Sequence, residues 1–154
     1  QMISKKRIET GKIVEPVDNQ DRCPVCQMYP ARFPKNKCQI ATKDGKVYHF
    51  CSTQCLFAFL KDSAKYAGAP VEAFAIWVVD YLDGRWISAR TAYYVIGSKE
   101  QGPMGKEAFA FDRMAQAKAF AAQHGGKAVI FQGVAIDKIL AAAGASSILG
   151  LRFG

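Results

Sequence analysis

The chain has 154 residues, half of them apolar and 12% aromatic, so it can form one domain, or two small halves packed together, without disulfide staples. No apolar run approaches the roughly 20 residues that cross a bilayer, and residues 1–20 are polar and basic, unlike a signal peptide. The net charge of +8 favours acidic partners, but the basic residues are scattered except for Lys5, Lys6 and Arg7, so we expect no nucleic-acid binding.

The first part of the chain is expected to form a hairpin, a helix and further strands. Residues 1–20 show little periodicity and are expected to be a flexible lead-in. Asp44 and Gly45 tolerate the positive φ of a tight hairpin turn, and Ser52 suits the N-cap of a helix. The expected elements, in chain order, are strands at 38–43 and 46–51, a helix at 53–68, a strand at 74–82 and one or two strands at 85–98.

The second part repeats this order. Asp112 suits a helix N-cap, and Gly125 and Gly126 suit the end of the same helix. The expected elements are strands at 92–98 and 108–112, a helix at 113–124, a strand at 127–131 and a short helix at 134–144. We therefore predict an α+β fold built from two similar ββαβ halves, which span residues 21–90 and 91–154.

Three sulfur-bearing residues lie close together between two prolines. Cys23, Cys26 and Met28 fall in the stretch DRCPVCQMYP, which contains Pro24 and Pro30. Because proline interrupts helices and strands, this stretch is not typical of a core element. It predicts either a metal site or a redox pair, and a loop disulfide between the two cysteines stays an alternative.

A second cysteine pair follows the predicted hairpin. Cys51 lies at the end of the second strand, and Cys55 lies in the first turn of the following helix, where the helix dipole stabilises a thiolate. A CxxC loop followed by a hairpin and a CxxxC helix start can gather four thiolates around a soft metal. The total of five cysteines cannot pair fully within one chain. Simple burial under the helix is the alternative for this second pair.

Methionine distinguishes between metals. A thioether is a poor ligand for zinc and a good one for Cu(I), so Met28, two residues after Cys26, favours copper. Met104 lies on a Gly/Pro loop and is a second candidate ligand, with an ordinary loop anchor as its alternative. Cys38 and His49 fit buried strand residues, and whether either reaches the site is left open.

Read together, several motifs resemble the NosL family over about residues 21–132: CPVCQMYP, YHFCSTQCLFAF, VVDY, WISARTAYYVIGS, GPMGKEAFAF and AFAAQHGGKAVIF. The resemblance implies a copper(I)-binding accessory lipoprotein that helps to assemble the copper centre of nitrous oxide reductase. It also implies two similar ββαβ halves resembling part of organomercurial lyase. The family's Cys-x-Met copper motif falls on Cys26 and Met28, and its PMG loop carries Met104.

The same resemblance implies a location and partners. In its full-length form, the protein is expected to be periplasmic and membrane-anchored through an N-terminal lipidated cysteine, which this sequence lacks. Its expected partners are proteins of copper-site assembly. Cys23, Cys51 and Cys55 depart from the simplest family members and resemble the TRASH and YHS metal-trafficking modules, so a different client or another soft metal stays open.

Three classes of function compete. The leading interpretation is a metallochaperone that binds Cu(I) and passes it on by ligand exchange. A structural zinc-binding interaction module, or a handler of another soft heavy metal, is the alternative. An enzyme that cleaves carbon–mercury bonds needs a proton donor, and in the sequence only Asp21 lies near a cysteine pair. We therefore expect no enzymatic activity.

Overall fold

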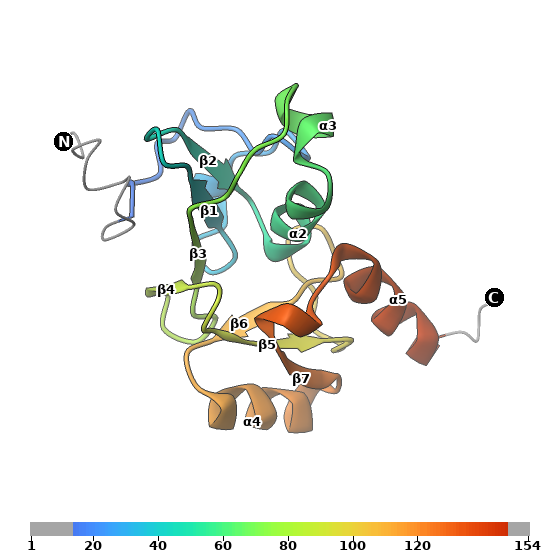
Figure 1. The fold of residues 1–154 in the computed structure, drawn as a ribbon. Coiled ribbons are helices and arrows are strands. Elements are labelled where there is room, and N and C mark those ends of the chain that lie inside the picture. Colours follow the sequence, from blue (N-terminus) through green and yellow to red (C-terminus); the bar gives the residue numbers. More distant parts are fainter. Residues whose placement is uncertain (1–13, 148–154) are drawn as a thin grey trace.

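The computed structural model describes the backbone of residues 14–147 and the side chains of residues 14–141. Over this range the chain forms two antiparallel sheets and four α-helices (Figure 1), which confirms the predicted α+β class. None of the described helices combines the length and apolar character needed to cross a membrane. Residues 1–13 of the expected lead-in lie outside the described residues. The proposed boundaries of the two halves stay a prediction.

The first sheet has the strand order β2-β1-β3-β4. Its strands are β1 (Cys38–Ala41), β2 (Val47–Phe50), β3 (Ala75–Val79) and β4 (Trp86–Ser88), and a 3-10 turn, η1 (Pro30–Arg32), precedes them. Two helices connect β2 to β3, namely α2 (Thr53–Lys61) and α3 (Ser63–Ala67). The predicted hairpin is confirmed, with Cys38 opposite Phe50 on one side and Val78 on the other.

The second sheet has the order β6-β5-β7. Its elements are β5 (Tyr93–Ile96), β6 (Phe109–Phe111), α4 (Met114–His124) and β7 (Lys127–Ile130), followed by η2 (Phe131–Gly133) and α5 (Ile136–Ser147). The two sheets share one pattern: two antiparallel strands are followed by a helix and then by a third strand that pairs with the first. This third strand is β3, beside β1, in the first sheet and β7, beside β5, in the second. Helix α4 covers the side of this sheet away from the first sheet, and α5 packs beside α2 (Figure 1).

Two helix boundaries differ from the sequence prediction. The helix expected over 53–68 divides at Asp62, whose backbone (φ −149°, ψ 71°) leaves the helical region. The N-cap of α4 is Arg113 and not Asp112, because the Asp112 carboxylate instead accepts a hydrogen bond from Arg85 (3.2 Å). The Asp112 carboxylate is thus engaged outside the helix that it was expected to cap.

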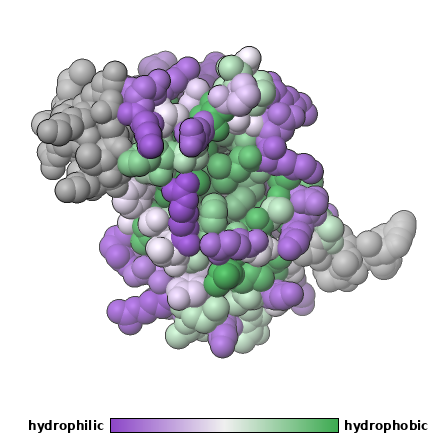
Figure 2. Space-filling model, in the orientation of Figure 1, coloured by the Kyte–Doolittle hydropathy of each residue, from purple (hydrophilic) through white to green (hydrophobic). Residues whose placement is uncertain are grey.

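One apolar cluster extends across both sheets. It includes Phe50 and Phe59 from the first half together with Tyr94 and Ile139 from the second, all at most 1% exposed. A smaller cluster lies between the second sheet and α4 and contains Phe109, Phe111 and Phe120, among others. Apolar residues also gather in the middle of one face, surrounded by hydrophilic ones (Figure 2). Burial of these apolar side chains stabilises the fold.

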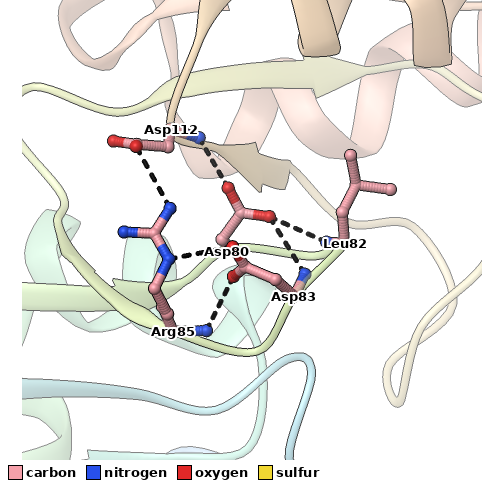
Figure 3. Close-up of polar contacts among 5 residues, drawn as sticks. All are labelled: Asp80, Leu82, Asp83, Arg85 and Asp112. Atoms are coloured by element: carbon pink, nitrogen blue, oxygen red, sulfur yellow. Dashed lines mark hydrogen bonds and ion pairs between the residues drawn. The ribbon is translucent and has the colours of Figure 1, made fainter.

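A buried carboxylate joins the two sheets. Asp80, which follows β3 and is 1% exposed, accepts hydrogen bonds from the backbone N–H groups of Leu82 (2.8 Å) and Asp83 (3.3 Å). Its other oxygen accepts one from the N–H of Asp112, just after β6 (2.9 Å). Arg85 spans the same junction by pairing with the carboxylates of Asp83 and Asp112 (Figure 3). These contacts fix how the second sheet, which carries the Met104 loop, meets the first.

Candidate metal centre

The CxxC segment folds into a tight knuckle. The N–H of Cys23 donates to the carbonyl of Met28 (2.8 Å), and the N–H of Gln27 donates to the carbonyl of Cys23 (2.9 Å). Gln27 has a φ of 67°, which only a minority of residues other than glycine adopt. This turn brings the backbone back on itself directly after Cys26, so both cysteine side chains can approach one point.

The second cysteine pair approaches the same point from the hairpin and helix α2. Cys51 directly follows β2, and Cys55 lies in the first turn of α2, after the N-cap Ser52. Both thiols are buried, at 0% and 1% exposed. The strand therefore ends at the site and the helix begins there, which places both sulfurs beside the positive end of the helix dipole.

The structure brings the four cysteines of these two pairs together. The Sγ atoms of Cys23, Cys26, Cys51 and Cys55 all lie within 4.8 Å of one another. The shortest separations are 3.2 Å between Cys26 and Cys51 and 3.6 Å between Cys51 and Cys55. Only the Cys26 side is partly exposed, because the other three residues are buried. Four sulfur donors at this spacing from two short segments suit a soft metal ion, either Cu(I) or zinc.

The thiols change one another's acidity. Hydrogen bonds from Cys51 and then Cys55 stabilise a thiolate on Cys23 and hold its pKa far below the ordinary range of a cysteine. The same contact with Cys23, together with burial, raises the pKa of Cys51 and of Cys55. One thiolate is therefore easy to form, whereas the deeper thiols keep their protons until a cation replaces them.

Two methionines that were predicted as ligands pack against the apolar core. Met28 and Met104 are both partly buried and pack against the apolar cluster that contains Cys23, Cys51 and Cys55. The Met104 loop is held to the start of α2, because the side chain of Gln54 donates to the Met104 carbonyl (3.2 Å). The loop predicted from sequence thus reaches the helix that carries Cys55. The roles of both methionines as ligands stay predictions.

Cys38 and His49 make other contacts. Cys38 is fully buried, its S–H donates to the Asn36 carbonyl (3.3 Å), and burial raises its pKa. It is absent from the four-sulfur group. The Nε2 atom of His49 lies 2.8 Å from a Glu15 carboxylate oxygen and 3.6 Å from one of Asp21. Both residues are buried in their strands, as expected.

A buried carboxylate that the sequence analysis missed lies at the N-terminus of α2. Glu107 is 3% exposed and accepts hydrogen bonds from the N–H of Gln54 (2.8 Å), the hydroxyl of Thr53 (3.2 Å) and the N–H of Met104 (2.8 Å). It takes the capping role expected of Ser52, whose side chain makes no such bond. Burial raises the pKa of Glu107.

In the sequence only Asp21 lies near a cysteine pair, and the fold adds Glu107, which bonds to the residue before Cys55. No local motif signals this role, because the contact joins segments far apart in the chain. The one available hint is Gly102 in the preceding loop. A Cβ added at Gly102 would lie 2.6 Å from the Glu107 side chain, so the loop needs a residue without one.

The family model described as NosL matches residues 14–139, which include every residue of the cluster. The chain belongs to the NosL family. A Stutzerimonas stutzeri protein named Copper-binding lipoprotein NosL is 34% identical over 131 residues, covering 80% of this chain and 68% of the relative. A protein of the same name from Achromobacter cycloclastes is 32% identical over 117 residues, covering 66% of this chain and 57% of the relative.

Solved structures agree with this membership. The crystal structure of the copper chaperone NosL from Shewanella denitrificans matches with a TM-score of 0.69 and 34% sequence identity, covering 80% of this chain and 96% of that one. The solution structure of apo-NosL from Achromobacter cycloclastes matches with a TM-score of 0.51 and 24% identity, covering 66% of this chain and 87% of that one, which is a likeness of fold alone. The resemblance inferred from the sequence is confirmed.

Proposed function

We propose that this NosL-family chain is a metallochaperone that holds Cu(I) at the four-cysteine cluster and passes it to a copper site in another protein. The observation that carries the proposal is the convergence of four sulfur atoms within 4.8 Å, with one of the four cysteines partly exposed. The names of its relatives, copper-binding lipoprotein and copper chaperone, support copper as the metal. The role is one of binding and transfer, without catalysis.

The donor set of the knuckle favours Cu(I) over zinc. A thioether is a poor ligand for zinc and a good one for Cu(I), and Met28 lies two residues after Cys26 on the same knuckle. Cu(I) is satisfied by soft sulfur at low coordination number, so fewer than four of the sulfurs suffice and the others can exchange with them as the ion moves.

Release of the ion is proposed to begin at Cys26. Its side chain is the only partly exposed member of the cluster, and Met28 lies two residues further along the same knuckle. A sulfur or nitrogen ligand of the partner can replace a thioether or an exposed thiolate on the copper ion before the buried cysteines dissociate from it. Transfer by stepwise ligand exchange needs such an accessible edge, which a closed structural site lacks.

The client is proposed from the family. We infer that the copper is destined for the copper centre of nitrous oxide reductase, and that the full-length protein works in the periplasm while anchored to a membrane by lipid. The names of the two curated relatives, which include the word lipoprotein, support the anchor. The proposed partners are the proteins that assemble that copper centre.

A structural zinc module is the second candidate. Three of the four cysteines are fully buried, and a knuckle joined to a helix start is a geometry that closed zinc sites use. The apolar cluster argues against metal-dependent folding, because aromatic and aliphatic residues from both sheets form most of it, beside Cys23, Cys51 and Cys55. Loss of the fold on chelation would therefore favour zinc.

Site-directed variants test the copper assignment. Under anaerobic conditions, competition with a chromogenic Cu(I) chelator should show a loss of affinity of at least about a hundredfold for Cys26→Ser, or roughly 2.7 kcal/mol. Met28→Ala should cause a smaller loss, with unchanged circular dichroism. Cys38→Ser is the matched control, since Cys38 lies outside the cluster. Wild-type affinity in Cys26→Ser would reject the assignment.

A further inference from the structure

A tyrosine held between two arginines directly follows the CxxC knuckle in the chain. Tyr29 directly follows Met28, and its ring lies 4.7 Å from the Arg22 guanidinium and 4.9 Å from that of Arg32. Arg22 also donates a hydrogen bond to the Tyr29 hydroxyl (2.6 Å). Cation–π contact and this bond fix the two exposed guanidinium groups beside the knuckle, so less side-chain entropy is lost when they bind a ligand. We call Arg22, Tyr29 and Arg32 the arginine face.

The segment that carries this face is basic. Residues 22–43 contain five lysines and arginines and no aspartate or glutamate. Asp18 and Asp21 precede this segment, and they accept hydrogen bonds from the N–H groups of Gln20 (2.7 Å) and Asp18 (2.8 Å). The ion pairs among the described residues do not include Arg22 or Arg32, so both guanidinium groups stay available to a partner's carboxylates.

We propose that the arginine face is the docking surface for an acidic segment of the protein that exchanges copper with Cys26. The inference rests on the proposed function. It adds that the partner carries carboxylates next to the soft ligands that receive the copper ion. A planar guanidinium matches a carboxylate in two parallel hydrogen bonds, which sets orientation as well as attraction. A lipid surface also carries negative charge, but it offers no ligand to receive the ion.

Docking at this position acts on the rate of transfer. The two guanidinium groups flank Tyr29, so a partner bound to them is held on the segment that also carries Cys26 and Met28. Complementary charge of this kind raises association rates by about 10- to 1000-fold at low salt, and salt removes the gain. The equilibrium affinity for Cu(I) does not depend on it, because neither arginine belongs to the sulfur cluster.

Two synthetic acceptor peptides provide the test. Both carry the same CxxC copper-binding centre, flanked in one by four glutamates and in the other by four glutamines. Stopped-flow transfer from the Cu(I)-loaded protein at low salt should be about tenfold faster or more to the acidic peptide. Arg22→Gln/Arg32→Gln should remove this preference, and Arg22→Glu/Arg32→Glu should reverse it, while Cu(I) affinity stays unchanged.

A matched control separates the local face from the overall charge of the chain. Lys118→Glu/Lys127→Glu makes the same change in charge at two exposed positions on α4 and β7, and it should keep most of the preference. An equal effect of both charge reversals, or equal transfer rates to the two peptides, would overturn the docking face. Binding of the wild type to anionic vesicles that is lost in the arginine variant, with equal peptide rates, would assign the face to lipid instead. Absence of Cu(I) binding in all samples would reject the proposed function itself.

Discussion

Replacing Cys51 by alanine should disconnect the cluster while leaving the fold in place. The Cys51 Sγ atom lies 3.2 Å from that of Cys26 and 3.6 Å from that of Cys55. Its hydrogen bond is also the largest cause of the lowered pKa of Cys23. The substitution therefore removes a candidate ligand and the strongest support of the thiolate in one step.

The size of the effect follows from that hydrogen bond. A hydrogen bond to a charged group contributes about 1.5–3 kcal/mol, and 1.36 kcal/mol corresponds to one pH unit in a pKa. The thiolate's pKa should thus rise by about one to two pH units. Loss of the buried sulfur atom should lower the free energy of unfolding by about 1–2 kcal/mol, too little to abolish folding.

Two measurements on the apo protein check this. Thiolate absorbance followed across pH reports the pKa, and urea unfolding reports the stability. Cys38→Ala is the matched control, because Cys38 is equally buried but absent from the four-sulfur group. It should lower stability by a similar amount and leave the thiolate's pKa unchanged. An unchanged pKa in Cys51→Ala, or an equal change in the control, would refute the coupling of the thiols.

Three further predictions concern protons, the joint between the sheets and the Met104 loop. Because the pKa values of Cys51 and Cys55 are raised, both thiols keep their protons until a metal ion displaces them. The apparent Cu(I) affinity should therefore increase with pH, by about tenfold per pH unit for each proton released. A Cu(I) affinity that does not change with pH would contradict this. Asp80→Ala leaves three backbone N–H groups without their acceptor and should lower the free energy of unfolding by about 2–4 kcal/mol; a loss below about 1 kcal/mol in urea unfolding would show that the joint is dispensable. In Gly102→Ala the new Cβ would lie 2.6 Å from the Glu107 side chain, so stability should fall by about 1–3 kcal/mol, and a wild-type thermal midpoint would argue against a fixed loop.

Local pattern predicted the parts of the site that depend on neighbouring residues. The turn at Asp44 and Gly45 and the register of the hairpin determine where Cys51 lies, and the helix start at Ser52 determines where Cys55 lies. The turn follows from backbone preferences within a few residues. The helix begins where Ser52 predicted, although Glu107 and not the Ser52 side chain caps it. Because the CxxC loop also folds locally, the approach of the two cysteine pairs could be expected from spacing alone.

Contacts between distant segments were beyond such reasoning. Glu107 caps α2 from the other half of the chain, 53 residues away from the N–H group whose hydrogen bond it accepts. The CxxC spacing left a pairing of Cys26 with Cys23 as an alternative, whereas the shortest contact of the Cys26 sulfur in the cluster is with Cys51 (3.2 Å). Both depend on how the elements pack in three dimensions, which a single sequence does not encode in any short motif.

Competition between Cu(I) and zinc under anaerobic conditions tests the central claim most directly. The reduced protein is given equal amounts of both ions and desalted, its metal content is measured, and circular dichroism is recorded before and after a strong Cu(I) chelator is added. We predict that the protein retains Cu(I), releases it to the chelator and keeps its fold, because many aromatic and aliphatic side chains from both sheets are buried in the apolar cluster. Retention of zinc in place of copper, with unfolding when the metal is removed, would contradict the account.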